Sequence, residues 1–145
     1  MKKIYVLTIL LLIFVVTQVL IAQSDKDFKV IINVDNKIDD LSKAKLDNIF
    51  MKKVTQWTDG TKIYPVNLNS RSFVRKAFSK SIHEKDIEAV QAYWRKQIFS
   101  GTNVPPLEKD SDAEIVKYVM ENPGSIGYVS KNTDTQGTKV IKLIK

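Results

Sequence analysis

Alternation of strand patterns with helical patterns is the feature of this 145-residue chain that most restricts its fold. Four apolar segments are typical of strands, residues 28–34, 62–67, 126–130 and 138–144, and helical patterns separate the first two and the middle two. Strands separated by helices need crossover connections, which favour a mostly parallel sheet with helices on its faces. The sequence therefore predicts a single α/β lobe.

Two of the strand patterns also predict positions in the sheet. The segment Phe28 to Val34 is β-branched and almost continuously apolar, which is typical of a strand covered on both faces, so we expect it to be central. Pro65 lies inside the segment 62–67. Because proline cannot donate to a strand ladder, it predicts that this strand lies at an edge or ends early.

Helical spacing predicts four helices, and their starts carry recognisable caps. Ser42 is a predicted N-cap, and Ser111 with Glu114 forms a capping box. In the longest helix, one apolar stripe is expected to contain Ile87, Val90, Trp94 and Ile98. The predicted helices run from Ser42 to about Met51, onward from about Phe73, from about Glu84 to Phe99, and from Ser111 to about Glu121.

Residues 1–22 form a predicted signal peptide, with an uncleaved N-terminal anchor as the alternative. Lys2 and Lys3 give a basic start, an apolar run follows, and the small residue Ala22 precedes a polar segment. The folded domain is then residues 23–145, and its net charge is +5, because the segment takes two lysines from the +7 of the whole chain. We expect a periplasmic or extracytoplasmic protein, tethered to the membrane if the segment is uncleaved.

The residue types available argue against most catalytic and metal-binding chemistry. The chain has no cysteine, which excludes disulfides, thiolate nucleophiles and lipid attachment at a cysteine. His83 is the one histidine, and we interpret it as a solvated linker residue and not as a general base. The acidic pairs lack a calcium-loop pattern and are expected to serve turns and caps: Asp39 with Asp40, and Asp110 with Asp112. No enzyme, metal or cofactor is predicted.

The basic residues are spread along the chain, singly and in pairs. A nucleic-acid interface needs a dense basic stripe, so nucleic acid is not an expected partner. One local cluster is more specific: Ser70, Arg71, Ser72 and Arg75 lie at a predicted strand-to-helix turn. Backbone N–H groups, the helix dipole, hydroxyls and guanidinium groups would converge there on an anion. The alternative is that Ser70 or Ser72 only caps the helix and that the arginines are solvated.

Several segments, in order, resemble the phosphate-type substrate-binding proteins of ABC transporters, which belong to the second type of periplasmic binding protein. The last segment is the most specific, because residues 122–129, Asn-Pro-Gly-Ser-Ile-Gly-Tyr-Val, nearly repeat the family's Asn-Pro-Gly-Ala-Ile-Gly-Tyr-Val. We expect its glycines, Gly124 and Gly127, to serve the turn and the strand. The other segments are residues 41–50, Trp57, Asp59-Gly60, residues 63–66, residues 72–78, Tyr93-Trp94 and Gly101.

The resemblance implies an exported solute-binding protein, with phosphate as the expected anion, but two departures weaken that implication. Binding proteins of this family close two lobes on a ligand, and 123 residues supply about one lobe. The family's Ser-Gly-Thr-Arg turn reads Ser72-Phe73-Val74-Arg75 here. Phe73 removes close backbone approach and Val74 cannot donate a hydrogen bond, so we expect weak, open binding.

Two hypotheses about partners follow from the single lobe. A homodimer would supply the second wall of the anion site. Alternatively, the lobe is a ligand-free interaction module that binds an envelope protein through aromatic anchors. Trp57 and Trp94 are expected in the core, and the other aromatic candidates are Tyr64 and Tyr128.

Overall fold

The computed structural model describes residues 28–145, whose strands form one six-stranded sheet in the order β2-β6-β1-β5-β3-β4. The predicted signal peptide or anchor, residues 1–22, lies outside the described residues. The strands are β1 (Phe28–Asn33), β2 (Asp40–Ser42), β3 (Tyr64–Leu68), β4 (Leu107–Lys109), β5 (Ser125–Ser130) and β6 (Thr138–Ile144).

β1 runs against the other five strands. It pairs antiparallel with β5 on one side and β6 on the other, for example Ile31 opposite Gly127 and opposite Val140. The pairs β2 with β6, β3 with β5 and β3 with β4 are all parallel. The predictions of a mostly parallel α/β sheet and of a central first strand are therefore confirmed.

The helices are α2 (Lys43–Phe50), α3 (Phe73–Phe78), the π-helical turn η2 (Ser79–His83), α4 (Ile87–Phe99) and α5 (Asp112–Glu121). Helices α2, α3 and α5 begin directly after serine caps, whereas α4 begins at Ile87 and not at about Glu84 as expected. Three serine hydroxyls accept a hydrogen bond from the backbone N–H three residues on, and the pairs are Ser42 with Lys45, Ser72 with Arg75, and Ser111 with Glu114. In the capping box, the Glu114 carboxylate returns to the N–H of Asp110, one residue before the cap.

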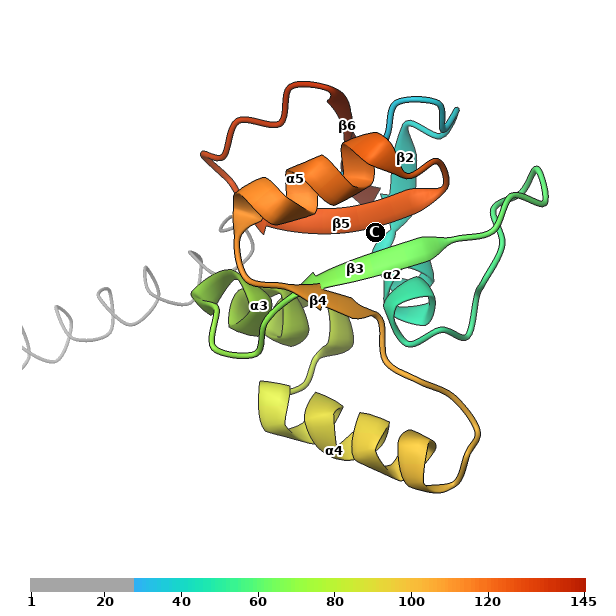
Figure 1. Ribbon diagram of the computed structural model, residues 1–145, viewed down its shortest axis with the longest axis vertical. Helices are drawn as coiled ribbons and strands as arrows, with labels where there is room; N and C mark the ends of the chain where they lie inside the picture. The colour runs from blue at the N-terminus through green and yellow to red at the C-terminus, as the bar shows by residue number, and fades with distance from the viewer. Residues whose placement is uncertain (1–27) are drawn as a thin grey trace, which may run out of the picture.

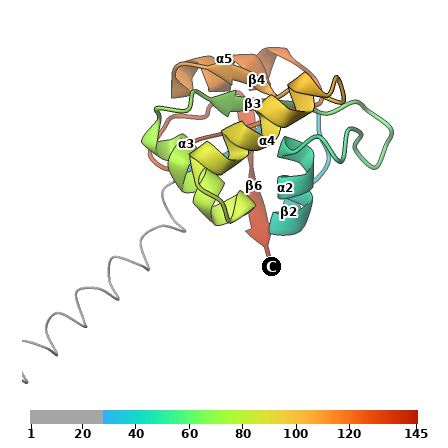
Figure 2. The same cartoon turned by 90° about the horizontal axis from the view of Figure 1, so that it is seen from below.

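Helices cover both faces of the sheet. Figures 1 and 2 show α5 on one side of the sheet and α2, α3 and α4 on the other. Gly127 of β5 faces α5, where an added Cβ would lie 2.7 Å from Ile115 Cγ2 and 3.0 Å from Val66 Cγ1. Gly124 lies in the turn before β5 with φ +82°, so the prediction that these glycines serve the turn and the strand is confirmed.

An aromatic cluster fills the core on the α2 and α3 side of the sheet. Tyr128 and Phe78 stack with ring centroids 3.8 Å apart and an interplanar angle of 7°. Phe50 and Phe28 pack against Phe78 edge-on, at 4.8 Å and 5.3 Å. All except the partly buried Phe28 are at most 1% exposed. Such rings bury large apolar areas, so this cluster fixes α2 and α3 to the sheet.

The expectation that Pro65 marks an edge strand is wrong. β3 lies between β5 and β4, and Pro65 is opposite Ile126 of β5. The pairing with β4 begins only at Val66, so Pro65 precedes the ladder in which its missing N–H would be needed. The true edges are β2 and β4, with three residues each.

The predicted apolar stripe of α4 is confirmed for three residues and wrong for the fourth. Ile87, Val90 and Trp94 are buried, while Ile98 is 54% exposed. Val90 and Trp94 pack with Met51 in a small cluster apart from the main core, and the last turn of α4 extends beyond it. Within residues 28–145, the helices lack the combined length and apolar character of a membrane span.

Candidate functional site

The turn between β3 and α3 is organised by Asn69. Its side-chain oxygen accepts a hydrogen bond from the N–H of Arg71 at 3.0 Å, and its carbonyl accepts one from the N–H of Ser72 at 3.1 Å. The Asn69 amide donates to the Asp110 carboxylate at 3.2 Å, which ties the turn to the residue before the α5 cap. This turn places Ser70, Arg71 and Ser72 together at the carboxyl end of β3.

Ser72 is the N-cap of α3, which decides between the two serines considered for that position. Its hydroxyl accepts from the N–H of Arg75 at 3.4 Å and retains its own proton for a further partner. Phe73, the next residue, is 86% exposed. Its ring is therefore exposed to solvent. Phe73 occupies the position of the glycine in the Ser-Gly-Thr-Arg motif of the family that the sequence resembles.

Arg75 is buried, with 3% of its surface exposed. One terminal nitrogen, Nη1, donates to the hydroxyl of Tyr128 at 3.1 Å, and that hydroxyl donates to the side-chain oxygen of Asn67 at 3.1 Å. The Nε group of Arg75 has no hydrogen-bond partner among the described residues, and no carboxylate there forms an ion pair with it. Among the described residues, Arg75 is thus a buried guanidinium with no carboxylate within 4.0 Å.

Tyr128 does not supply a counter-charge. Burial raises the pKa of its hydroxyl to about 12, although the Arg75 charge and the hydrogen bond from Arg75 act in the opposite direction. The hydroxyl is therefore neutral at physiological pH, and it can accept from Arg75 while donating to Asn67.

Arg71 lies in a different environment, on an open hollow of about 580 Å³ at the carboxyl ends of β3 and β5. It is the one basic residue among those that line the hollow, and Asp110 and Asp112 lie among the others. The Asp112 carboxylate accepts hydrogen bonds from the N–H of Ser130 at 3.0 Å and from the Thr133 hydroxyl. The remaining lining residues are Leu68, Asn69, Ser72, Phe73, Val74, Ser111 and Ser130.

The four sequence-predicted residues are thus brought to one turn but not to one surface. Ser70, Arg71 and Ser72 are partly or fully exposed, whereas Arg75 is buried behind them. The alternative that both arginines are solvated fails for Arg75. Asn67 and Tyr128 were not predicted from the sequence as neighbours of Arg75. The one available signal was the polar character of Asn67 within the apolar segment 63–68.

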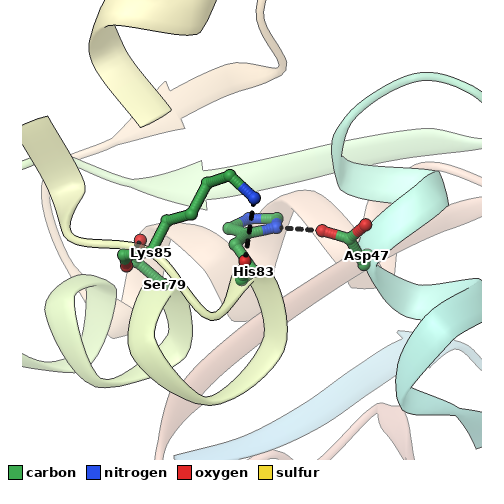
Figure 3. Close-up of polar contacts among 4 residues, drawn as sticks. All are labelled: Asp47, Ser79, His83 and Lys85. Carbon is green, nitrogen blue, oxygen red and sulfur yellow. Dashed lines mark hydrogen bonds and ion pairs between the residues drawn. The ribbon is translucent and has the colours of Figure 1, made fainter. Parts of the chain in front are cut away.

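The expectation that His83 is solvated is wrong. Its side chain is 3% exposed, and its Nδ1 lies 2.6 Å from Oδ1 of Asp47 on α2 (Figure 3). Its ring packs edge-on against Phe78 at 5.4 Å. Figure 3 shows Ser79 and Lys85 beside it, where the Ser79 hydroxyl donates to the carbonyl of Lys85. Because solvent barely reaches His83, this pair fastens η2 to α2.

Burial is the main influence on the pKa of His83 and lowers it below the usual 6.5, although Asp47 acts to raise it. A lowered pKa in the folded state makes the neutral ring a stabilising feature above pH 6.5, and this stabilisation is lost as the pH falls through the lowered value. We expect the urea concentration at the unfolding midpoint to decrease as the pH is lowered below 6.5. This decrease should be smaller in His83→Gln. Equal decreases in both proteins would contradict this assignment.

Of the acidic pairs, Asp112 lies in the first turn of α5, next to the cap as expected. Asp39 instead forms a long-range ion pair with Lys139 of β6 at 2.6 Å. Within residues 28–145, no three His, Cys, Asp or Glu side chains are grouped closely enough to hold a metal ion. Of the aromatic candidates, Trp57, Trp94 and Tyr128 are core residues, and Tyr64 is 41% exposed.

Comparison with known proteins gives a family model and similar solved structures. Residues 19–143 match the model of the PBP superfamily domain, where PBP denotes periplasmic binding protein. A search of curated proteins found no match. An ABC-type phosphate transport receptor from Vibrio cholerae has a TM-score of 0.65 and 17% identity, over 81% of this chain and 46% of that protein.

Two further structures give a similar result. A substrate-binding protein attributed to a phosphate ABC transporter of Clostridium perfringens, solved with bound phosphate, has a TM-score of 0.64 and 22% identity, over 81% of this chain and 44% of its own. PstS from Borrelia burgdorferi has a TM-score of 0.56 and 16% identity, with coverages of 81% and 47%. This chain therefore spans less than half the length of each structure, and the likeness is one of fold.

Proposed function

Because the chain belongs to the PBP superfamily, we propose that it is an exported, single-lobe solute-binding protein that captures a small anion such as phosphate. The proposed site is the β3 to α3 turn with Ser70, Arg71, Ser72 and Arg75. No step of catalysis is part of this function. The proposal includes a domain of residues 23–145 that is released outside the cytoplasm, or tethered there by residues 1–22.

The observation that carries the proposal is the buried charge of Arg75. A guanidinium in the protein interior costs several kcal/mol unless a counter-charge or a full set of hydrogen bonds compensates it. Arg75 has one neutral partner, Tyr128, and an unpartnered Nε. An anion bound at the turn would supply the missing negative charge. Binding would therefore be favoured, because the anion would offset the cost of burying the Arg75 guanidinium.

The exposed part of the site would make the direct contacts. Arg71 offers its guanidinium from the wall of the open hollow, and Ser72 keeps a hydroxyl proton that it can donate. Asp110 and Asp112 on the same hollow repel an anion. Since the hollow is also open to water, which screens charges, we propose weak binding by one lobe.

A second wall would strengthen such a site by excluding water. The matched part of this chain covers less than half of each solved structure, so in this proposal the wall comes from a partner. A second copy of the chain or an envelope protein that covers the hollow would desolvate Arg71 and strengthen its contact with the anion. Measured affinity should then increase with the fraction of assembled protein.

The test is thermal unfolding of the purified protein with phosphate, sulfate or chloride at matched ionic strength. A ligand that binds only the folded state raises the unfolding temperature. At a ligand concentration a hundred times the dissociation constant, the added free energy of unfolding is about 2.7 kcal/mol. We expect a rise with phosphate above that with chloride. The rise should be absent in Arg75→Met and retained in Lys96→Gln, which removes an exposed cation of α4. Equal midpoints in phosphate and chloride would refute the proposal.

A further inference from the structure

A second hollow lies at the opposite end of β3. Tyr64, the first residue of that strand, lines it, whereas Leu68, the last residue, lines the hollow beside Arg71. Four residue steps along a strand span about 13 Å, so the two hollows are separate. We name this one the lysine hollow. Its volume is about 360 Å³, and its lining residues are Ile49, Lys52, Val54, Thr55, Lys62, Ile63, Tyr64, Pro65, Asn103, Leu107 and Tyr118.

The lining of the lysine hollow includes basic residues and no acidic residue. The basic residues are Lys52 and Lys62. Neither lysine forms an ion pair with another described residue. The pKa of Lys52 is lowered, first by partial burial and then by the positive charge of Lys62. The lysine hollow therefore combines a partly buried lysine with an exposed one, and the positive charge of Lys62 disfavours that of Lys52.

Hydrogen bonds hold the backbone at both lysines. Lys52 follows α2 with φ 54°, a left-handed backbone conformation that residues other than glycine seldom adopt. Its N–H donates to the carbonyl of Ile49 at 3.0 Å. Lys62 bridges to Gln56, and the next residue, Ile63, donates its N–H to Thr55 at 2.9 Å. Because both backbones are anchored, relaxation of the repulsion is limited to side-chain rotation.

The remaining walls are apolar and aromatic. Ile49, Ile63 and Pro65 are buried residues at the hollow, and the tyrosine rings of Tyr64 and Tyr118 lie at it as well. The Lys62 ammonium lies 5.3 Å from the Tyr64 ring centroid. Burial raises the pKa of Tyr118, and the charge of Tyr64 raises it further. The hydroxyl of Tyr118 is therefore a hydrogen-bond donor at neutral pH.

We propose that the lysine hollow binds a small organic phosphate monoester. Its phosphate would lie between Lys52 and Lys62, and its apolar or aromatic part against Ile63, Pro65 and Tyr64. A phosphate monoester carries about −1.5 to −2 charge at pH 7, which matches two ammonium groups. The volume is within the range of pockets that hold small ligands, about 300 to 1,000 Å³. This site is independent of the anion site at the β3 to α3 turn.

Phenyl phosphate is the probe, and titration calorimetry of the purified protein is the measurement. We expect binding in the wild type, and dissociation constants raised about tenfold or more in Lys52→Gly and in Lys62→Gln, because each variant loses a charge-assisted contact. Lys52→Gly suits φ 54° and should keep its melting temperature. Lys53→Gln, an exposed neighbour outside the hollow, should bind as the wild type does.

Two comparison arms identify where the probe binds. Arg75→Met removes the charge of the other site, so it should abolish only the phenyl phosphate binding at the β3 to α3 turn and should retain the component that Lys52→Gly and Lys62→Gln weaken. Benzyl alcohol has the ring without the charge and should bind at least about tenfold more weakly. The proposal is overturned by the absence of phenyl phosphate binding, by full binding in Lys52→Gly and Lys62→Gln, or by a loss in Arg75→Met alone.

Discussion

Replacing Phe78 by alanine is expected to lower the free energy of unfolding by about 3 to 5 kcal/mol, the usual cost of removing a fully buried phenylalanine. Phe78 is 0% exposed and is the centre of the aromatic cluster, where it contacts Tyr128, Phe50 and Phe28. Removal of its ring leaves a cavity between α3 and the sheet. Urea unfolding followed by tryptophan fluorescence measures the change.

Phe73 provides a matched control on the same helix. It is 86% exposed, and its one described ring contact is the Lys76 ammonium at 5.7 Å. Phe73→Ala should therefore change the free energy of unfolding by no more than about 0.5 kcal/mol. Comparable losses in the two variants would contradict the assignment of Phe78 to the core and Phe73 to the surface.

Local patterns predicted the parts of the fold that depend on neighbouring residues. The caps at Ser42 and Ser111 follow from a hydroxyl and an N–H three residues apart, and they are local in sequence. The apolar run of β1 likewise indicates burial on both faces without knowledge of its partners. These features were confirmed because chain segments of a few residues determine them.

Features that depend on distant pairing were missed. Whether Pro65 lies at an edge depends on β4, a strand of three residues that has no pattern of its own. His83 is buried beside Asp47, which lies 36 residues earlier in the chain. Neither partner can be identified from spacing, since both pairings exist only once the helices have packed on the sheet.

The candidate site divides in the same way. Ser70, Arg71 and Ser72 were found because a polar strand-to-helix turn is visible in sequence. The burial of Arg75 was not, because its partner Tyr128 lies 53 residues further along the chain. Arg75 precedes Phe78 by one helical turn and so shares its inward face, but a charged residue at such a position is normally assigned to the surface.

Arg75→Met is expected to raise the free energy of unfolding in the absence of anions by about 1 to 3 kcal/mol. Buried charges without a counter-charge are destabilising, and replacing buried ionic groups with apolar residues of similar volume is neutral or stabilising. Tyr128 would lose a donor but still donate to Asn67, so no new buried donor is left unpaired. Urea unfolding in a phosphate-free, low-salt buffer measures this difference, and Arg75→Lys, which retains a charge, should not share the gain.

The combination of two effects with opposite signs is what distinguishes a binding arginine from a structural one. If Arg75 is held for an anion, Arg75→Met gains stability without phosphate and loses the stabilisation that phosphate gives the wild type. An arginine that serves only to hold Tyr128 would give a less stable variant in every buffer, because its hydrogen bond is then a net gain to the fold. A loss of stability in both buffers would therefore remove the observation on which the anion site rests, whatever the response of Arg71 variants.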